Sequence, residues 1–101
     1  MNISITEDEN IVTATLNGRL DTAASSEVAP DFQKLSESAN KEIIIDCTEL
    51  EYISSSGLRL FLSLRKSSAE KGGKVIIKKI NDSIRNVFTM TGFYNLFEIK
   101  D

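Results

Sequence analysis

Residues 43–58 read IIIDCTELEYISSSGL, an apolar run followed by acidic and aromatic residues, three consecutive serines and a glycine. The residues Ile43–Ile45 are typical of a short strand that is covered on both faces, as in a parallel sheet. Serines are favoured at helix N-termini because their hydroxyls accept hydrogen bonds from unpaired backbone N–H groups. The segment therefore predicts a strand over Ile43–Asp46, a short acidic link, and a helix that begins at Ser54–Ser56.

Apolar patterning elsewhere in the chain predicts four more strands. Apolar residues alternate with polar ones over Ile3–Ile5 and again over Ile11–Asn17, which is the pattern of half-buried strands. The link Glu7–Asn10 between them is typical of a hairpin turn. Two later apolar stretches, Val75–Ile77 and Leu96–Ile99, complete the predicted set.

Three stretches have helical spacing. The first lies within Ala24–Ala39, where Pro30 is expected in the first turn or at a break, because proline cannot donate a helical hydrogen bond. The second begins at the serines and ends near Lys71, where two glycines follow, and the third runs from about Asn81 to Gly92. The residues expected on buried faces are Val28, Phe32 and Leu35 of the first helix, Leu58, Phe61, Leu62 and Ala69 of the second, and Ile84, Val87 and Phe88 of the third.

The order of these elements defines the fold class. Helices that alternate with apolar strands predict an α/β domain with a mixed, mainly parallel β-sheet and helices packed on it, in the order β-β-α-β-α-β-α-β. The 101 residues, of which 41% are hydrophobic, are enough to build one core. We therefore expect a single domain that spans residues 1–101.

Composition restricts the partners that the protein can have. The formal net charge is -3, the pI is about 5.0 and the basic residues are scattered, so a nucleic-acid-binding surface is disfavoured. No apolar run approaches the length of a membrane span, and the first residues lack the features of a signal peptide. We therefore expect a cytoplasmic protein without a membrane partner.

Catalysis and metal binding are disfavoured by the same composition. The chain has no histidine, which is the usual general base, serine activator and metal ligand, so we expect no enzyme, metal site or cofactor. The single cysteine, Cys47, lies at the end of an apolar run, which predicts a packed side chain without chemistry. A serine hydrolase that lacks histidine is the one catalytic alternative, and it would require turnover of simple esters.

The chain contains GRLD at residues 18–21, SSSGL at residues 54–58 and MTGF at residues 90–93. These three stretches resemble motifs of the STAS family (sulphate transporter and anti-sigma-factor antagonist) and occur in the family's order. The stretch SSSGL at residues 54–58 resembles the family's loop Asp-Ser-Ser/Thr-Gly-Leu. The stretch GRLD at residues 18–21 resembles the Gly-x-Leu/Ile-Asp that precedes the first helix, and MTGF at residues 90–93 resembles a late Met/Thr-Gly-Leu/Phe turn. The resemblance covers nearly the whole chain and implies a STAS-like fold.

The same resemblance implies a function. Anti-sigma-factor antagonists of this family bind an anti-sigma-factor serine kinase while they are unphosphorylated, and this binding frees a sigma factor. Phosphorylation reverses the binding, and a serine phosphatase resets the cycle. By position, Ser55 corresponds to the phosphorylated serine and Ser56 to its companion, whereas Ser54 stands where the family has aspartate. Helix capping alone would explain one of these three serines.

Partner binding is assigned to residues around this loop and the first helix. Gly57 matches the motif glycine, although glycine is also tolerated in a first helical turn. Arg59 is placed to reach a phosphate on Ser55 across one turn, or to serve as an ordinary surface arginine. Asp21 matches the family's acidic residue after the second strand, and it is equally typical of a helix cap. The predicted partner-binding residues are Asp21, Thr22, Ser54, Ser56, Gly57 and Arg59.

A second hypothesis assigns the same fold to a constitutive binding subunit, for example of a signalling or lipid-transport assembly, without phosphorylation. Ser54 keeps this alternative open, because the aspartate that it replaces could contribute to recognition by a kinase. A phosphoryl group on the serine loop of protein isolated from its own cells would distinguish the two hypotheses.

Overall fold

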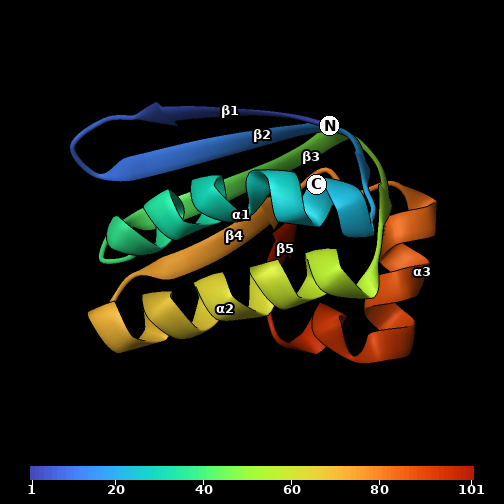
Figure 1. The fold of residues 1–101 in the computed structure, drawn as a ribbon. Helices are drawn as coiled ribbons and strands as arrows, with labels where there is room; N and C mark the ends of the chain where they lie inside the picture. The colour runs from blue at the N-terminus through green and yellow to red at the C-terminus, as the bar shows by residue number, and fades with distance from the viewer.

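Five strands form one sheet in the order β1-β2-β3-β4-β5, so neighbours in the sheet are also neighbours in the chain (Figure 1). β1 pairs with β2 antiparallel, and the other pairs are parallel. This computed structural model describes residues 1–101, and the α/β class and element order predicted from the sequence are confirmed. The elements are β1 Asn2–Glu7, β2 Ile11–Leu20, α1 Thr22–Glu37, β3 Glu42–Ile53, α2 Ser55–Lys71, β4 Lys74–Lys78, α3 Asp82–Thr91, the 3-10 helix η1 Phe93–Asn95 and β5 Glu98–Lys100.

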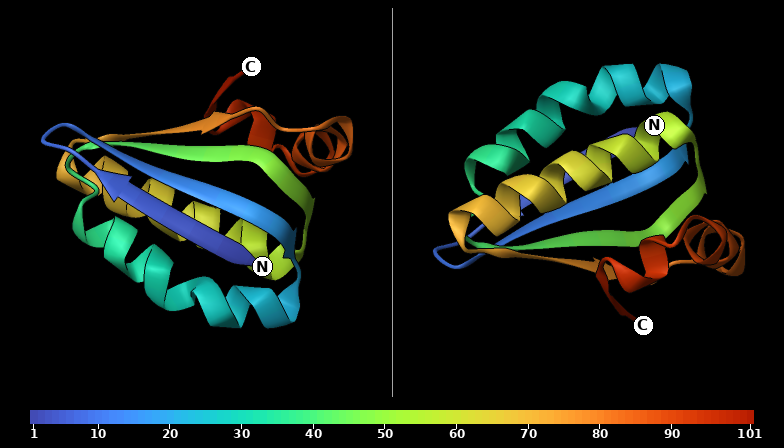
Figure 2. Two further views of the ribbon diagram at one scale, coloured as in Figure 1. Left: turned by 90° about the horizontal axis from the view of Figure 1, so that it is seen from above. Right: turned by 90° about the horizontal axis from the view of Figure 1, so that it is seen from below.

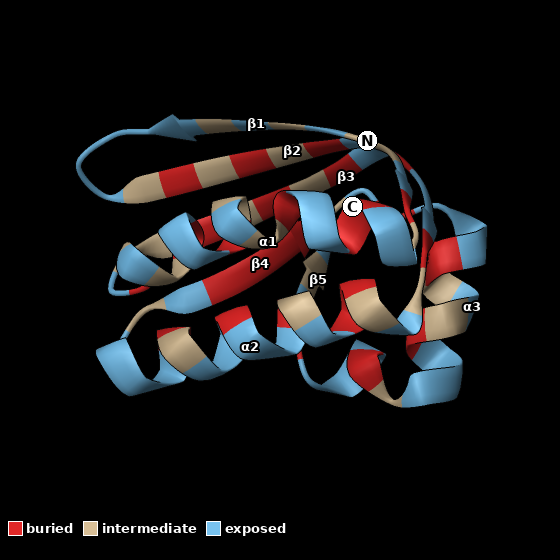
Figure 3. Cartoon of the chain, in the orientation of Figure 1, coloured by how far each residue is buried: buried red, intermediate tan, exposed pale blue.

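Helices α1 and α2 lie side by side against one face of the sheet, and α3 runs across the end of the sheet beside β3 (Figure 2). One core of 24 buried residues joins the three helices to the sheet. The first half of β3 is buried on alternate residues only (Figure 3). The expectation that this strand is covered on both faces is therefore wrong, since Ile43 and Ile45 are fully buried but Ile44 is half-buried.

β3 is much longer than the predicted strand Ile43–Asp46, because the acidic stretch expected to be a link continues the strand to Ile53. Two irregularities in its pairing with β2 interrupt the alternation of buried and exposed residues, so the sequence pattern did not predict this extension. The register moves by one extra residue of β3 between Thr15 and Asn17, and again after Gly18. Each extra residue changes which side of the strand faces the core. The buried positions of β3 are therefore Ile43, Ile45, Cys47, Leu50 and Ile53.

Helix α1 continues through Pro30, so the prediction that this residue lies in the first turn or breaks the helix is wrong. Proline has no N–H to donate to the carbonyl of Ser26, four residues earlier. Both residues are exposed, so the unpaired carbonyl lies on the solvent side of the helix, where water can replace the missing bond. The opposite side is held by three residues that are buried as predicted, Val28, Phe32 and Leu35.

Phe61 of α2 lies at the centre of the core. Its ring stacks on Phe32 of α1 with 5.8 Å between the ring centroids. Phe88 of α3 and Phe97, just before β5, each approach it edge-to-face at 6.4 Å. Such aromatic pairs contribute roughly 0.5–1.5 kcal/mol each beyond the area that they bury. This cluster connects all three helices.

The buried face of α2 differs in part from the predicted one. Leu58 and Phe61 are buried as expected, but Leu62 and Ala69 are exposed. The remaining buried positions are Gly57, Leu64 and Ser68. Ser68 was missed because a serine in an amphipathic pattern reads as a solvent-facing residue. In α3, Ile84 and Phe88 are buried as predicted and Val87 is half-buried.

Gly72 and Gly73, between α2 and β4, provide a matched pair for testing this packing. A Cβ on Gly73 would lie 2.0 Å from the carbonyl oxygen of Ala39 and 2.5 Å from that of Lys41. A Cβ on Gly72 would meet nothing within 4 Å, although the φ of +77° at that residue strains an L-residue. We predict that Gly73→Ala lowers the free energy of unfolding by more than about 3 kcal/mol and Gly72→Ala by about 1 kcal/mol, measured by urea denaturation. Equal losses would contradict the close approach at Gly73.

Cys47 is fully buried, as its place in the sequence predicted. Burial, together with the neighbouring carboxylate of Asp46, raises the pKa of its thiol to about 12. The reactive thiolate is therefore almost absent near neutral pH. We expect a thiol reagent at about pH 8 to label Cys47 in denaturant but not in the folded protein. Rapid labelling of the native state would mean that this part of β3 opens easily.

Candidate functional site

The serine loop (Ser54–Ser56) and Asp21 lie at one edge of the sheet, where β2 and β3 end. The two strands are paired to their last residues, with Leu20 opposite Ile53. The backbone N–H of Ser54 donates to the carbonyl of Leu20 at 2.9 Å, which ties the two connections together. Helices α1 and α2 therefore begin near each other, at the right of Figure 1.

Ser54 is the N-cap of α2. Its backbone is extended, with φ -92° and ψ 172°, and its Oγ accepts a hydrogen bond from the N–H of Gly57 at 3.2 Å. Its carbonyl accepts a bond from the N–H of Leu58 at 2.9 Å. A side-chain cap of this kind stabilises a helix by roughly 1 kcal/mol. One of the three serines was expected to cap the helix, and Ser54 has this role.

Because Ser54 provides the cap, the next two hydroxyls are not needed for it. Ser55 is the first residue of α2 and is exposed, and Ser56 is half-buried. Unpaired N–H groups and the positive end of the helix dipole make this position favourable for negative charge. The serine loop thus lies at an exposed helix N-terminus directly after β3, as predicted. Arg59 lies one turn later and is exposed, so its interaction with a phosphate stays a prediction.

Asp21 caps α1 in the same way. Its Oδ1 accepts a hydrogen bond from the N–H of Ala24 at 2.9 Å. Its carbonyl accepts bonds from the backbone N–H and the hydroxyl of Ser25, at 2.9 and 2.8 Å. Thr22, the first residue of α1, is exposed. The cap alone is a sufficient structural reason for an aspartate at position 21. A contact of Asp21 or Thr22 with a partner protein stays a prediction.

Gly57 allows α2 to approach the strand ends closely. The residue is buried, and a Cβ there would lie 2.8 Å from Cγ of Leu20 and 2.9 Å from Cγ1 of Ile53. Distances this short require the neighbouring side chains to move. The first turn of α2 therefore rests directly on the ends of β2 and β3, and Gly57 sets the position of the serine loop.

An exposed pair beside this edge was missed by the sequence analysis. The guanidinium of Arg19 lies over the ring of Tyr52, 4.5 Å from its centroid, and the two residues are paired across β2 and β3. Their neighbours Leu20 and Ile53 are buried, so the pair points away from the core. Spacing alone could not reveal the pair, because it depends on both extra residues of β3. Arginine and tyrosine are enriched at binding hot spots.

Asn81 is the N-cap of α3, the third helix that begins with a side-chain cap. Its side-chain oxygen accepts a hydrogen bond from the N–H of Ile84 at 2.8 Å and caps α3. Its amide nitrogen donates to the carbonyl of Leu50 at 3.1 Å. One side chain thus caps α3 and fixes it to the irregular half of β3.

The candidate site is an open surface rather than a pocket. None of the three cavities of the protein is lined by the serine loop, Asp21 or Arg59. No group of three or more histidine, cysteine, aspartate or glutamate residues is arranged to hold a metal ion. No helix has the length and apolar character needed to cross a membrane.

These features define an α/β domain whose exposed, capped helix N-termini form the candidate site. The profile of the STAS domain matches residues 2–101, and the chain belongs to the STAS domain family, as its motifs indicated. It is 26% identical over 104 residues to the anti-sigma-B factor antagonist of Listeria monocytogenes, an alignment that covers 100% of this chain and 91% of that protein.

Solved structures of SpoIIAA, an anti-sigma factor antagonist, have a similar fold. The unphosphorylated form has a TM-score of 0.76 and 20% sequence identity, and the match covers 99% of this chain and 88% of that one. The phosphorylated form, from Bacillus, has a TM-score of 0.74 and 20% identity, and covers 97% and 90% of the two chains. This likeness confirms the fold.

The cap at Ser54 can be tested by substitution. Ser54→Ala removes the acceptor for the Gly57 N–H and should lower the free energy of unfolding by about 1 kcal/mol. Ser54→Asp keeps an acceptor and adds a charge that the helix N-terminus favours, so it should be at least as stable as the wild type. Ser55→Ala is the matched control and should change stability by less than about 0.5 kcal/mol. If urea unfolding showed that Ser55→Ala is less stable than Ser54→Ala, Ser54 would not be the cap.

Proposed function

We propose that the protein is an anti-sigma-factor antagonist that binds an anti-sigma-factor serine kinase while unphosphorylated and so frees a sigma factor. Phosphorylation of Ser55 reverses this binding, and a serine phosphatase restores it. Support comes from membership of the STAS domain family and from relatives named as anti-sigma-B factor antagonists. Antagonists of this class are regulatory binding proteins rather than enzymes.

The free hydroxyl of Ser55 is the observation that carries the proposal. Ser54 supplies the cap of α2, so the hydroxyl of Ser55 is not needed to cap this helix. Ser55 is also exposed. A kinase must reach its acceptor oxygen from solvent. Ser56 is half-buried and therefore less accessible, which favours Ser55 as the acceptor.

Phosphorylation at this position requires no refolding. A phosphoryl group adds about 1.5 to 2 negative charges near neutral pH, and the N–H groups of the first turn of α2 can accommodate them. In a complex, the same charge would be enclosed between two surfaces and would lose its hydration, which weakens binding. The switch would therefore act on the interface and leave the fold intact.

The proposed docking surface is the edge shared by the starts of α1 and α2. Gly57 contributes indirectly, because it is buried and sets the position of the serine loop. Asp21 and Ser54 hold the helix starts in place through their cap hydrogen bonds. The residues that we assign to partner binding are Asp21, Thr22, Ser54, Ser56 and Arg59 on this surface, with Gly57 buried beneath it.

A second candidate function is constitutive binding to a partner through the same surface, without phosphorylation. The observation that favours it is Ser54, since a kinase that reads the aspartate of the family motif would not find it in this chain. Under this alternative, Ser55 would be an ordinary exposed residue of the first helical turn.

The test uses unmodified protein to capture partners from its host, followed by addition of ATP. We expect the wild type to capture a kinase, to be phosphorylated on Ser55 and then to be released. Ser55→Ala should capture the same kinase and stay bound in ATP. Ser55→Asp should bind it at least about tenfold more weakly, although a carboxylate carries less charge than a phosphate. Ser56→Ala is the matched control and should be phosphorylated and released like the wild type.

Mass spectrometry of the bait separates the outcomes. Phosphate found on Ser54 or Ser56 would refute the residue assignment but keep the switch. A complex that survives in ATP, with none of the serines modified, would refute the switch and support constitutive binding.

A further inference from the structure

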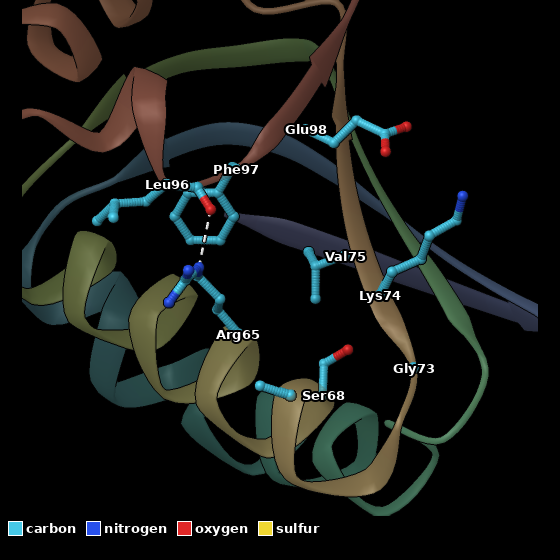
Figure 4. A pocket seen from close by; sticks show the side chains of 9 residues that line it. Arg65, Ser68, Gly73, Lys74, Val75, Leu96, Phe97 and Glu98 are labelled. Carbon is cyan, nitrogen blue, oxygen red and sulfur yellow. Dashed lines mark hydrogen bonds between the residues drawn. The ribbon is translucent and has the colours of Figure 1, made fainter.

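A small cavity lies beside the C-terminal half of α2, away from the serine loop (Figure 4). It is bounded by α2, the start of β4 and the segment that leads into β5, and its volume is about 240 Å³. Its walls combine apolar side chains with a few polar groups, which is the usual composition of a ligand pocket. The lining residues that matter most are Arg65, Ser68, Val75, Leu96 and Phe97.

Ser68 is a polar residue of this wall that the fold does not use. It is 2% exposed, and its Oγ is the only buried side-chain oxygen or nitrogen without a hydrogen-bond partner. An unpaired buried hydroxyl destabilises a protein, and alanine at this position would avoid that loss. In Figure 4 the hydroxyl points from α2 toward the start of β4, on the side of the cavity.

Arg65 lies one turn before Ser68 on the same side of α2, and both residues line the cavity. Its Nε donates a hydrogen bond to the carbonyl of Leu96 at 2.8 Å, which holds the exposed guanidinium beside Leu96 at the rim of the cavity. No carboxylate forms an ion pair with it. The Nη groups are therefore free to donate to an anion.

The other charged groups around the cavity have partners elsewhere. Lys74 pairs with Glu42 at 3.4 Å, and Glu98 pairs with Lys100 at 3.3 Å. Arg65 thus supplies the one positive charge at this cavity that no carboxylate balances.

We propose that this cavity binds a small carboxylate with an apolar body. The carboxylate would accept hydrogen bonds from the Nη groups of Arg65 and from the hydroxyl of Ser68. The apolar part would pack on Val75 and Phe97, which are 7% and 8% exposed. The volume of about 240 Å³ is below the roughly 300–1,000 Å³ of pockets for drug-sized ligands, so a molecule of the size of benzoate or hexanoate fits. This site does not rest on the function proposed for the serine loop.

Amide NMR titrations with benzoate and hexanoate test the proposal, with benzyl alcohol and hexanol as uncharged counterparts. The carboxylates should give saturable shifts of the amides that line the cavity, and the alcohols should bind at least about tenfold more weakly. Arg65→Gln should weaken carboxylate binding at least about tenfold. Lys66→Gln, which removes a neighbouring charge outside the cavity, is the matched control and should bind like the wild type.

Ser68→Ala gives a second readout that does not depend on the ligand. Without ligand, this variant should have a higher Tm than the wild type, because the unpaired hydroxyl is gone. With ligand, it should bind carboxylates about tenfold more weakly. A lower Tm of Ser68→Ala would show that the hydroxyl has a structural partner. That result, unshifted cavity amides with both carboxylates, or full binding by Arg65→Gln would overturn the proposal.

Discussion

The pairing of β2 with β3 to their last residues is the constraint on which the serine loop and both helix starts depend. From Leu16 to Leu20, β2 advances four residues, while β3 advances six from Cys47 to Ile53. The two extra residues of β3 absorb this difference, so that both strands end on a core residue. The residue that follows each strand is a helix cap, Asp21 after β2 and Ser54 after β3. Removal of either extra residue would turn the inward side of the strand end outward and displace the serine loop.

At this edge, residues that hold the structure surround one residue, Ser55, whose side chain is exposed. The caps fix the helix starts, and Gly57 lets α2 rest on the strand ends. Ser55 lies between these fixed points, so its backbone is held in place while its side chain is exposed to solvent. A rigid frame around an exposed hydroxyl suits a modification that alters surface charge, because the fold has nothing to rearrange when the charge arrives.

The periodicity of apolar residues was enough to predict the fold class, the order of the elements and most of the core, since those features follow from local patterns. Local patterns failed where a distant strand decides the geometry. The extension of β3 required its register with β2, and so did the Arg19–Tyr52 pair. Pro30 was misplaced because its cost depends on which side of α1 faces water. The wall around Ser68 combines α2, β4 and the segment before β5, which no single stretch of sequence places together.

At position 54, serine and aspartate would stabilise the helix start in the same way but would differ in charge. Serine and aspartate both offer an oxygen to the N–H groups of the first turn, so either residue can cap α2. They differ in electrostatics, because an aspartate would place a fixed negative charge beside Ser55. A phosphate on Ser55 would then be repelled by that carboxylate and would share the positive end of the helix with it. With the neutral Ser54, the helix start would offer its full positive potential to a phosphate on Ser55 alone. The neutral Ser54 would therefore make a phosphate on Ser55 easier to accommodate than an aspartate at this position would.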